Sequence, residues 1–470
     1  MTEVGNGNQS FHVLSSETEG AASRGAVIKK KFMKSRIILF LMSFLPCAQL
    51  MAQARVTVTN PSSLQRQELV AIDAQQVYDL VGISQGEPFV VSQVVGQKPD
   101  GSDKLREVDF QVTSDGKLLI DASVQPGRTT EYVVERGVPR RMRSYDTLPQ
   151  RTAAGGWGVG KVWTEGRLYP ERLDDIAWEN DRGAYRVYGP AFQRNGSIGY
   201  GPDVWVKNTP ELVVARRFSM EIDIKPTQRQ LSRAGYKAEA DQLVDDNSFH
   251  IDHGMGNDCY AVGATLGCGA PAILSADGNI CFPYAWQQYE ILDNGPMRFT
   301  VSLVFGDTLI EGRRLQEHRI ISLDKGSNFN RVEVWYEDLS SSNRHDKPLT
   351  VCAGFPLHAP NEPTVVLGND FIQYADPTDN PTANAFQLYV GCLFPEGEVS
   401  TRTDFGHAIG VTTLKVGEHW TYYAGSAWSK YDVRNQVEWQ ARINTVLQAL
   451  RSPLETMVSK PDSTTNTTQK

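Results

Sequence analysis

The chain has 470 residues, of which 40% are hydrophobic and 22% are charged, with 40 Gly and 24 Pro. This composition excludes a disordered, collagenous or coiled-coil protein, and the length allows two or three domains with buried cores. There are 47 Lys and Arg residues against 55 Asp and Glu residues, and the resulting net charge of −8 excludes the bulk basic surface of nucleic-acid-binding proteins.

The N-terminal segment has the pattern of a secretory signal peptide. Lys34 and Arg36 precede an apolar run at 37–45, and Ala52 and Ala54 provide a small-residue cleavage signal. The run is too short for a membrane span, which needs about 20 residues. We therefore expect export to the periplasm or secretion.

The predicted signal peptide starts near Met33, so residues 1–32 are interpreted as a mis-called start. Removal of residues 1–54 leaves 41 basic and 52 acidic residues, a net charge of −11. A soluble product is expected, with a lipid anchor on Cys47 as the alternative. No later apolar run reaches 18 residues, so no membrane span is expected.

Five cysteines follow residue 54, and this odd number leaves at least one outside any disulfide in a monomer. The first three, Cys259, Cys268 and Cys281, lie within 23 residues, which permits one local disulfide in an oxidising compartment. No C-x-x-C motif occurs, so no structural zinc site is expected.

Residues 55–137 are predicted to form a small N-terminal β-sandwich. Apolar residues alternate with polar ones before and after the turn signal Asp115-Gly116, and further short alternating runs precede and follow them. Because this segment contains no Trp, His or Cys, we expect it to be a packing module without catalytic groups.

Residues 138–450 are predicted to form a larger antiparallel β domain that carries the catalytic groups. Helical patterns occur at 228–244, as a polar insertion, and at 435–450, where apolar residues recur at helical spacing. The polar segment 451–470 is predicted to be a disordered tail. No short fixed repeat occurs, which disfavours a propeller.

The densest group of chemically active side chains is the glycine-rich stretch 249–269. It contains His250, Asp252, His253, Asp258 and Tyr260. These residues could supply a base, an acid or a metal site, although no helical H-E-x-x-H spacing supports a metal. The alternative is a tight turn whose polar groups satisfy buried backbone.

A second group lies in W-E-N-D-R, Trp178 to Arg182. If the strand continues through this motif, Glu179 and Asp181 face the same side about 6.6 Å apart, at ~3.3 Å per residue. That separation is near the range of paired glycosidase carboxylates. An ordinary charged strand edge with a salt bridge explains the pattern equally well.

Trp178 of W-E-N-D-R and two further groups are candidates for substrate binding. One is Asp203, Trp205 and Lys207 in P-D-V-W-V-K, and the other is Trp428 in Y-Y-A-G-S-A-W. Trp residues at loop ends can stack on sugar rings, but more often they pack in a core.

Taken together, the motifs occur in the order of a known family. They are W-E-N-D-R at Trp178, Y-G-P-A at Tyr188, P-D-V-W-V-K at Pro202, D-H-G-M-G-N-D at Asp252, L-G-C-G at Leu266, L-D-K-G-S-N at Leu323 and Y-Y-A-G-S-A-W at Tyr422. This set resembles the secreted "domain of unknown function 4861" family of polysaccharide-degrading bacteria.

The resemblance implies an all-β fold, with a small β-sandwich followed by a galactose-mutarotase-like β-supersandwich. It also implies a role among enzymes of glycan degradation, often those that handle unsaturated uronyl or rhamnogalacturonan-type sugars. The chain departs from the family pattern at 227–248, where a polar insertion precedes His250 and could reshape one rim of the cleft.

The leading hypothesis is a carbohydrate-active protein that performs β-elimination at a uronic acid of an acidic or pectin-like glycan. This reaction needs a group that neutralises the carboxylate, a base for the C5 proton and an acid for the leaving oxygen. We assign these roles to Arg182, to His250 or His253, and to Tyr260.

Two alternatives stay open. The first is glycoside hydrolysis with Glu179 and Asp181, or Asp203, as the carboxyl pair. The second is a non-catalytic glycan-binding protein or an epimerase-like protein that acts on free sugars. The expected partner is a glycan and not a nucleic acid, and no cofactor is expected, with a calcium ion left open. We also predict that the 178–182 and 252–258 segments converge in one cleft.

Overall fold

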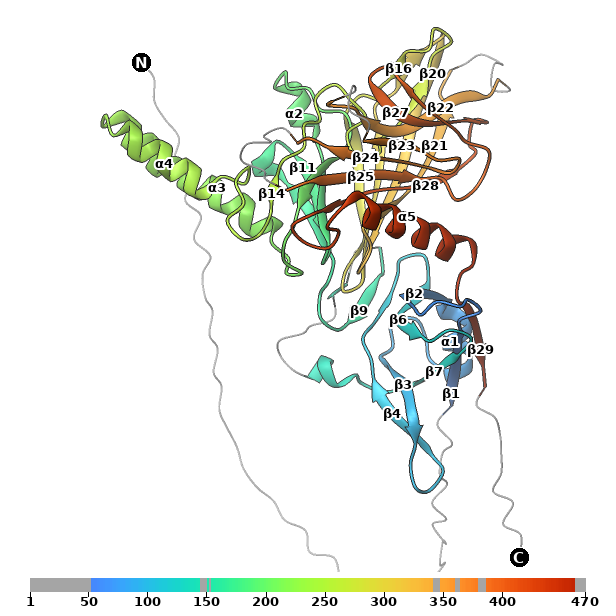
Figure 1. Ribbon diagram of the computed structural model, residues 1–470. Coiled ribbons are helices and arrows are strands. Elements are labelled where there is room, and N and C mark those ends of the chain that lie inside the picture. The colour runs from blue at the N-terminus through green and yellow to red at the C-terminus, as the bar shows by residue number, and fades with distance from the viewer. Residues whose placement is uncertain are drawn as a thin grey trace, which may run out of the picture. The chain divides into compact units, whose positions relative to one another are not determined.

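The structure is a computed structural model that describes residues 52–143, 150–151, 154–340, 347–359, 364–378 and 386–460 (Figure 1). Most of the predicted signal peptide and residues 461–470 lie outside the described residues. Antiparallel strands dominate the described part of the chain, in which five α-helices also occur. This confirms the prediction of a mainly β protein.

Two antiparallel sheets form the N-terminal domain and share one hydrophobic core. Helix α1 (Ala74–Val81) packs into the same core and is capped by Asp73, whose side chain accepts the N–H of Gln76. Sheet I contains, in spatial order, β29 (Glu455–Ser459), β1 (Gln53–Thr59), β7 (Thr129–Arg136), β3 (Phe89–Gln97) and β4 (Asp103–Glu107). Sheet II contains β2 (Arg66–Asp73), β6 (Lys117–Val124), β5 (Phe110–Val112), β9 (Trp157–Val159) and β8 (Gln150–Arg151).

The structure corrects three sequence predictions about this domain. The domain does not end at residue 137, because β9 pairs with β5. It does contain a tryptophan, since Trp157 packs edge-on against Phe89 and Phe110 in the core. The segment after residue 451 is not wholly a disordered tail, because β29 pairs with β1 along five residues. These pairings join residues that are distant in sequence, so local patterns do not reveal them.

Three antiparallel sheets form the larger domain. Sheet III contains β10 (Glu165–Tyr169), β11 (Asp175–Glu179), β12 (Gly183–Val187), β13 (Asp203–Val206) and β14 (Asn257–Asp258). Sheet IV contains, in spatial order, β17 (Trp286–Asn294), β18 (Arg298–Phe305), β20 (Arg313–Asp324), β21 (Phe329–Asp338), β28 (Trp420–Trp428), β25 (Leu388–Leu393), β24 (Phe371–Asp376) and β23 (Val365–Leu367), and β19 (Thr308–Ile310) pairs with β20. Sheet V contains β16 (Ile280–Cys281), β15 (Pro271–Leu274), β22 (Leu349–Pro356), β27 (His407–Leu414) and β26 (Ser400–Asp404).

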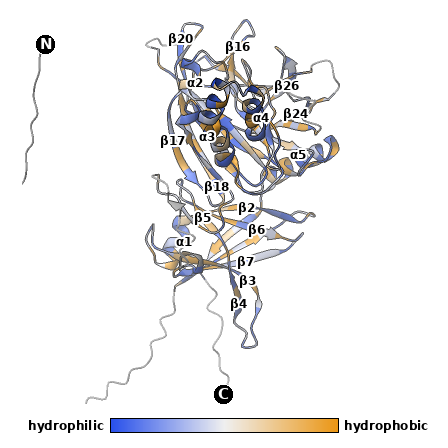
Figure 2. Cartoon of the chain, turned by 90° about the vertical axis from the view of Figure 1, so that its left-hand side faces the viewer, coloured by the Kyte–Doolittle hydropathy of each residue, from blue (hydrophilic) through white to orange (hydrophobic). Residues whose placement is uncertain are grey.

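One continuous core joins the three sheets of the larger domain. Side chains from one face of sheet III, such as Tyr185 and Val204, meet Phe299 and Val332 of sheet IV and Val351 of sheet V. Hydrophobic and hydrophilic residues are mixed along the strands (Figure 2), because alternate side chains point to opposite faces. Each face of sheet III therefore has its own partners, and this decides which predicted site residues become core.

The two predicted helical segments are both helical. Helix α5 (Gln436–Arg451) begins after Asn435, whose side chain caps the N–H of Glu438, and it covers the face of sheet IV opposite the main core. The polar insertion begins earlier than predicted and contains two helices, α3 (Val214–Arg233) and α4 (Lys237–Asn247), which extend away from sheet III in Figure 1. The chain turns between them at Gly235, where φ is +90°.

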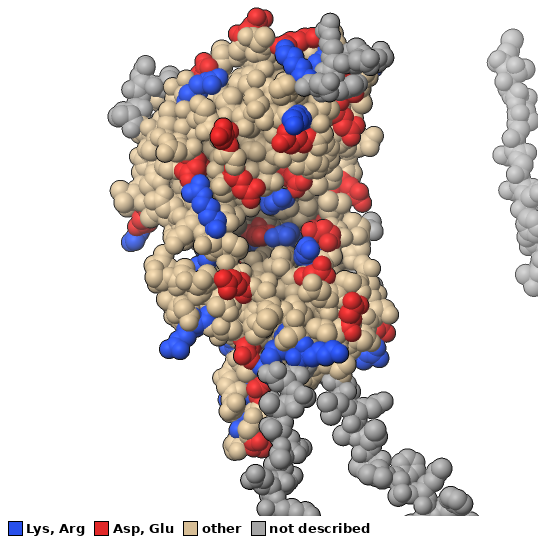
Figure 3. All heavy atoms as spheres, turned by 90° about the vertical axis from the view of Figure 1, so that its right-hand side faces the viewer, with Lys and Arg blue, Asp and Glu red and all other residues tan. Residues whose placement is uncertain are grey.

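The remaining helices are short: α2 (Pro190–Arg194) and the 3-10 turns η1 (Arg140–Arg143) and η2 (Pro170–Arg172). None of the five cysteines that follow residue 54 forms a disulfide, so the local bridge that their spacing permits is not made. Among the described residues, no helix is both long and apolar enough to span a bilayer. Figure 3 shows basic and acidic side chains interspersed over one face of the molecule.

Candidate functional site

Glu179 and Lys207 form a buried ion pair that fixes the start of α3. Lys207 Nζ lies 2.6 Å from Glu179 Oε2 and also donates to the carbonyl of Asn180. Glu179 Oε1 accepts the N–H groups of Val213 and Val214, each at 2.7 Å. The N–H groups at a helix N-terminus favour such a negative partner. Both carboxylate oxygens of Glu179 are therefore occupied by structural contacts.

The carboxylates of Glu179 and Asp181 do not share a strand face. Strand β11 ends at Glu179, and Asp181 lies in the turn that leads to β12. Asp181 Oδ1 accepts the N–H of Gly326 at 2.6 Å. The predicted separation assumed that the strand continues through Asp181, and this assumption is wrong because Asn180 closes the turn by accepting the N–H groups of Arg182 and Gly183.

Arg182 is anchored within the same turn. Its Nη1 lies 2.9 Å from Asp432 Oδ2, and its Nε donates to the carbonyl of Gly326. Tyr431 also donates to the carbonyl of Asp181 at 3.1 Å. The 178–182 segment is thus tied to the residues that follow β28.

The 252–258 loop is tied to the residues after β28 as well. Asp252 Oδ1 accepts the N–H groups of Gly254 and Gly256 at 2.8 Å, and its Oδ2 pairs with Lys430. Burial raises the pKa of Asp252, but the ammonium of Lys430 and these two amides outweigh burial and hold the pKa below its usual value. Lys430 and Asp432 therefore link the two segments whose convergence the sequence predicts.

The two predicted histidines lie at the surface. His253 Nε2 is 3.0 Å from the carbonyl of Asp245 in α4, and the residue is exposed. His250 Nδ1 is 3.2 Å from the carbonyl of Asp258, and 56% of its side chain is exposed. Within the described part of the chain, no carboxylate lies at hydrogen-bonding distance from either histidine: the ion pair of His250 with Asp258 spans 3.9 Å, and His253 contacts a backbone carbonyl.

Asp203 belongs to a buried charge cluster on the face of sheet III that points away from the main core. Arg186 lies 2.6 Å from Asp203, 3.1 Å from Asp258 and 3.6 Å from Asp175. Burial raises the pKa of Asp175 to about 6 against the opposing effect of Arg186. Tyr188 donates to Asp203 Oδ2 at 3.1 Å. One arginine thus holds three carboxylates together in the interior.

All three predicted substrate-binding tryptophans are buried core residues, and Trp428 is 3% exposed. Trp178 is 1% exposed, donates to Asn330 Oδ1 at 2.7 Å and stacks on Phe299. Trp205 is 5% exposed and packs between Phe218 and Phe249, under the helical insertion. Neither ring face is open to a sugar in this structure.

Tyr260, by contrast, lies beside a histidine that a carboxylate orients. His358 Nδ1 is 2.7 Å from Asp376 Oδ2, and the rings of His358 and Tyr260 meet edge to face with centroids 5.4 Å apart. Asp376 is fully buried, and its Oδ1 accepts the N–H of Thr378 at 2.8 Å. His358 keeps 22% of its side chain exposed, so solvent reaches the group.

Trp428 shares the sheet face on which Asp376 lies. Asp376 of β24 pairs with Leu388 of β25, and Leu388 pairs with Trp428 of β28. Directly opposed residues on neighbouring strands point to the same side. Leu388, Trp428 and Tyr260 also belong to one cluster of buried residues.

Three buried polar atoms on these residues and on Thr378 find no hydrogen-bond partner among the described residues. They are the hydroxyl of Tyr260, the hydroxyl of Thr378 and the indole Nε1 of Trp428. A buried polar group without a partner is costly, and such groups recur where a ligand or water completes the network. We refer to Tyr260, His358, Asp376, Thr378 and Trp428 as the Tyr260 site.

The sequence analysis identified Tyr260 and Trp428 but missed His358 and Asp376. His358 lies two residues beyond the end of β22, Asp376 is the last residue of β24, and each is close to a proline, in L-H-A-P and Y-A-D-P. A polar side chain at the end of a buried strand is a usable signal, because loops at strand ends carry binding and catalytic groups.

The chemistry available at the Tyr260 site is proton transfer. Because Asp376 accepts the Nδ1 proton of His358, Nε2 is the nitrogen that takes up a further proton. Burial raises the pKa of Tyr260 well above its ordinary value, so its hydroxyl keeps its proton at neutral pH. Among the described residues, no group of three or more His, Cys, Asp or Glu is arranged to hold a metal ion.

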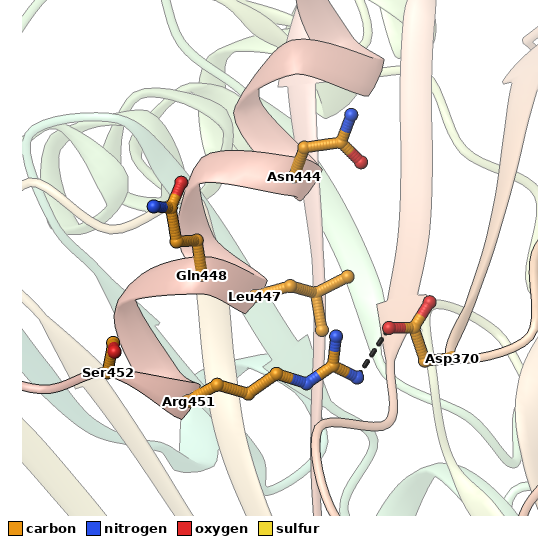
Figure 4. Close-up of a pocket in the computed structure, with 6 residues that line it drawn as sticks. All are labelled: Asp370, Asn444, Leu447, Gln448, Arg451 and Ser452. Atoms are coloured by element: carbon orange, nitrogen blue, oxygen red, sulfur yellow. Dashed lines mark ion pairs between the residues drawn. The ribbon is translucent and has the colours of Figure 1, made fainter. Parts of the chain in front are cut away.

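A separate cavity of about 320 Å³ lies at the end of α5 (Figure 4). Asp370 and Arg451 form an ion pair across it. It is lined by Asp370, Asn444, Leu447, Gln448, Arg451 and Ser452. Because no residue of the Tyr260 site and no predicted site residue lines it, we do not assign the chemistry to this cavity.

The chain is similar to known proteins in sequence and, more distantly, in structure. "Uncharacterized protein P7" of Formosa agariphila is 26% identical over 312 residues, which cover 63% of this chain and 70% of the relative. An α-mannosidase of Enterococcus faecalis V583 matches 87% of this chain and 46% of its own, with 8% identity and a TM-score of 0.35. A protein of glycosyl hydrolase family 38 from Enterococcus faecalis matches 87% and 47%, with 8% identity and a TM-score of 0.40.

The chain thus spans less than half of the length of either solved structure. The family match is more extensive, because residues 58–456 match the family described as "Domain of unknown function (DUF4861)". This span contains both domains of the fold and every residue of the Tyr260 site. The protein belongs to this family, as its motifs predict.

Proposed function

We propose that this protein is a carbohydrate-active enzyme that performs β-elimination at a uronic acid of an acidic or pectin-like glycan, at the Tyr260 site. The observation that carries the proposal is the His358–Asp376 pair beside the buried, unpartnered hydroxyl of Tyr260. A base held in one tautomer beside a protonated acid is the pair that elimination requires.

The reaction divides between these residues as follows. His358 Nε2 takes the proton from C5 of the uronic acid, and the electron pair of that C–H bond forms the C4–C5 double bond. The bond from C4 to the leaving oxygen breaks, and Tyr260 donates its proton to that oxygen. Asp376 stabilises the charged imidazole of His358. After the product leaves, His358 releases its extra proton to water and the Tyr260 phenolate takes one proton up from water, so both residues regain their starting states.

The base in this proposal differs from the one that the sequence suggested. His250 and His253 lack an orienting carboxylate and lie at the surface, whereas His358 has both an orienting partner and Tyr260 beside it. The role of Tyr260 as the acid is retained.

Hydrolysis is the second candidate, and the arrangement of carboxylates disfavours it. A glycosidase needs two carboxyl groups about 5–9.5 Å apart on either side of the bond. Asp376 is engaged by His358 and Thr378, Glu179 by Lys207 and the start of α3, and Asp203 by Arg186 and Tyr188. Elimination requires no such pair.

The proposal also includes an exported location and a supersandwich arrangement of sheets III to V. The signal-peptide pattern around Met33 supports export to the periplasm or beyond the cell. The shared core of the three antiparallel sheets supports the arrangement that the family resemblance implies.

The test is a screen of acidic polysaccharides and their lyase-derived oligosaccharides, read by ultraviolet absorbance and by reducing ends. Elimination creates a conjugated double bond, so both signals should rise together. His358→Ala should abolish both, and the matched surface variant His250→Ala should retain both. Reducing ends without new absorbance would establish hydrolysis, and tight binding without any product would establish a binding protein.

A further inference from the structure

Elimination at a uronic acid needs a cation for the substrate carboxylate, and this inference rests on the proposed function. A carboxylate beside C5 opposes removal of the C5 proton unless its charge is neutralised. Arg182, the residue that the sequence suggests, is a poor fit. Its Nη1 is held by Asp432 and its Nε by the carbonyl of Gly326, and Arg442 lies 3.7 Å from the same Asp432 carboxylate. Arg182 is therefore already committed to structural contacts with the turn at Gly326 and with Asp432, which precedes α5.

The ammonium group of Lys430 lies over an aromatic residue of the Tyr260 site, Trp428. Its Nζ lies 5.4 Å from the ring centroid of Trp428 and 5.1 Å from that of Phe386. Phe386 is 42% exposed, so a ligand can reach the aromatic surface beneath the ammonium group. A cation over aromatic faces is stabilised there without losing its charge.

Hydrogen bonds connect the residues next to Phe386 and Lys430 to Asp376, directly from Gln387 and indirectly, through Gln387, from Ser429. Gln387, which follows Phe386, donates from Nε2 to the carbonyl of Asp376. Ser429, which precedes Lys430, donates its N–H to the carbonyl of Gln387 at 2.9 Å. Lys430 and Phe386 are therefore attached, through one residue each, to the strand ends that hold the site.

The present partner of Lys430 can release it at little cost. Without Lys430, Asp252 would keep the N–H groups of Gly254 and Gly256 at 2.8 Å and the side-chain amide of Asn208 at 3.3 Å. Because three donors remain, Asp252 is not left as a buried, unsatisfied charge when the ammonium group turns to another carboxylate. Lys430 itself keeps 34% of its side chain exposed.

We infer that Lys430 binds the carboxylate of the substrate sugar and thereby makes the enzyme specific for uronic acids. A flexible ammonium group is suited to this exchange, because it can move from one carboxylate to another without a fixed bidentate geometry. Lys430 is a specificity residue in this assignment, while His358 and Tyr260 transfer the protons.

Binding is tested first, because it does not depend on turnover. Calorimetry compares trigalacturonic acid with its methyl ester, using the unaltered protein, Lys430→Met, Lys430→Arg and the exposed control Lys415→Met. Lys430→Met should weaken binding of the acid roughly 10- to 100-fold, the range of a charge-assisted hydrogen bond, and leave binding of the ester unchanged. Lys430→Arg should restore part of the loss, and Lys415→Met should show none.

Kinetics then separates this inference from the proposed function. If the unaltered protein eliminates, Lys430→Met should lower kcat/KM for the acid by a similar factor and lose the preference for acid over ester. Equal acid binding and equal kcat/KM in Lys430→Met and the unaltered protein would overturn the role of Lys430 alone. Absence of elimination on every substrate would overturn the proposed reaction, while a Lys430-dependent preference for the acid in binding would still support the site.

Discussion

His358 and Asp376 meet at 2.7 Å although one lies just beyond a strand of one sheet and the other ends a strand of a different sheet. His358 follows β22 of sheet V, and Asp376 is the last residue of β24 of sheet IV. The buried Asp376 has a second donor in the N–H of Thr378, so the carboxylate is held while it orients the imidazole. This contact places an oriented imidazole beside Tyr260.

Asp376→Asn should remove activity without unfolding the protein. The new amide oxygen can still accept the N–H of Thr378, but the amide nitrogen would donate to His358 Nδ1 and reverse the tautomer. We expect kcat to fall about 10²- to 10⁴-fold, the range of lost general acid–base catalysis. Initial rates on the substrate identified by the screen, with circular dichroism as the folding control, measure this. Unchanged kcat would show that Asp376 does not orient the base.

Tyr260→Phe should separate activity from stability. The hydroxyl of Tyr260 has no partner among the described residues, so its loss should leave the free energy of unfolding unchanged or raise it by about 1 kcal/mol. Turnover should fall strongly, because the acid is gone. Urea unfolding and initial rates are the two measurements.

The matched control for Tyr260→Phe is Tyr185→Phe. Tyr185 is equally buried, but its hydroxyl donates to the carbonyl of Asn328 at 2.8 Å. Its removal should cost about 1 kcal/mol of stability. A stability loss in Tyr260→Phe as large as in Tyr185→Phe would mean that the Tyr260 hydroxyl has a structural partner and would weaken its assignment as the acid.

Glu179→Gln should lower the free energy of unfolding, because Glu179 has a structural role and takes no part in the proposed reaction. It leaves the ammonium of Lys207, which is 1% exposed, without its charged partner. Breaking such a buried pair costs about 3–5 kcal/mol. Combining Glu179→Gln with Lys207→Met should recover part of that loss. Chemical unfolding measures both, and a Glu179→Gln protein with normal stability and no turnover would instead place Glu179 in the reaction.

Asp175 should make stability depend on pH. Burial raises its pKa from 3.8 to about 6 in the folded protein, so its contribution is fully present below pH 3.8 and is lost as the pH rises through about 6. The difference between the two pKa values corresponds to roughly 3 kcal/mol of the free energy of unfolding. Relative to Asp175→Asn, the unaltered protein should therefore lose stability between pH 4 and pH 7. Urea unfolding of both proteins at four pH values in this range tests the sign, and a constant difference would refute it.

Local patterns of residues are enough to predict that the protein is mainly β, where its longer helices lie and which family it belongs to. Alternation of apolar and polar residues predicts antiparallel strands, because successive side chains on a strand point to opposite faces. The helical spacing after Asn435 predicts α5 almost to the residue, since that helix packs by the periodic apolar side chains that the sequence displays. The ordered motifs predicted the family, which the match over residues 58–456 confirms.

The tertiary structure decided which of these residues are available for chemistry. Trp178 and Trp205 lie on opposite faces of sheet III, and each became core because something packs on its face: sheet IV on one side and the helical insertion on the other. Periodicity shows that two faces exist but not what covers them. For the same reason, the sequence does not show that the carboxylate of Glu179, a candidate for hydrolysis, instead accepts the N–H groups of Val213 and Val214 at the start of α3.

The Tyr260 site depends on contacts that no local pattern encodes. Tyr260 lies 98 residues before His358, and His358 and Asp376 lie in loops or strand ends of two sheets. The ionisable residues that are dense along the chain, such as Glu179, Asp181 and Asp252, mostly stabilise turns and a helix start, and Tyr260 is the exception among them. His358 and Asp376 belong to no such dense cluster, because strand pairing and sheet packing, not sequence proximity, bring these two residues within hydrogen-bonding distance.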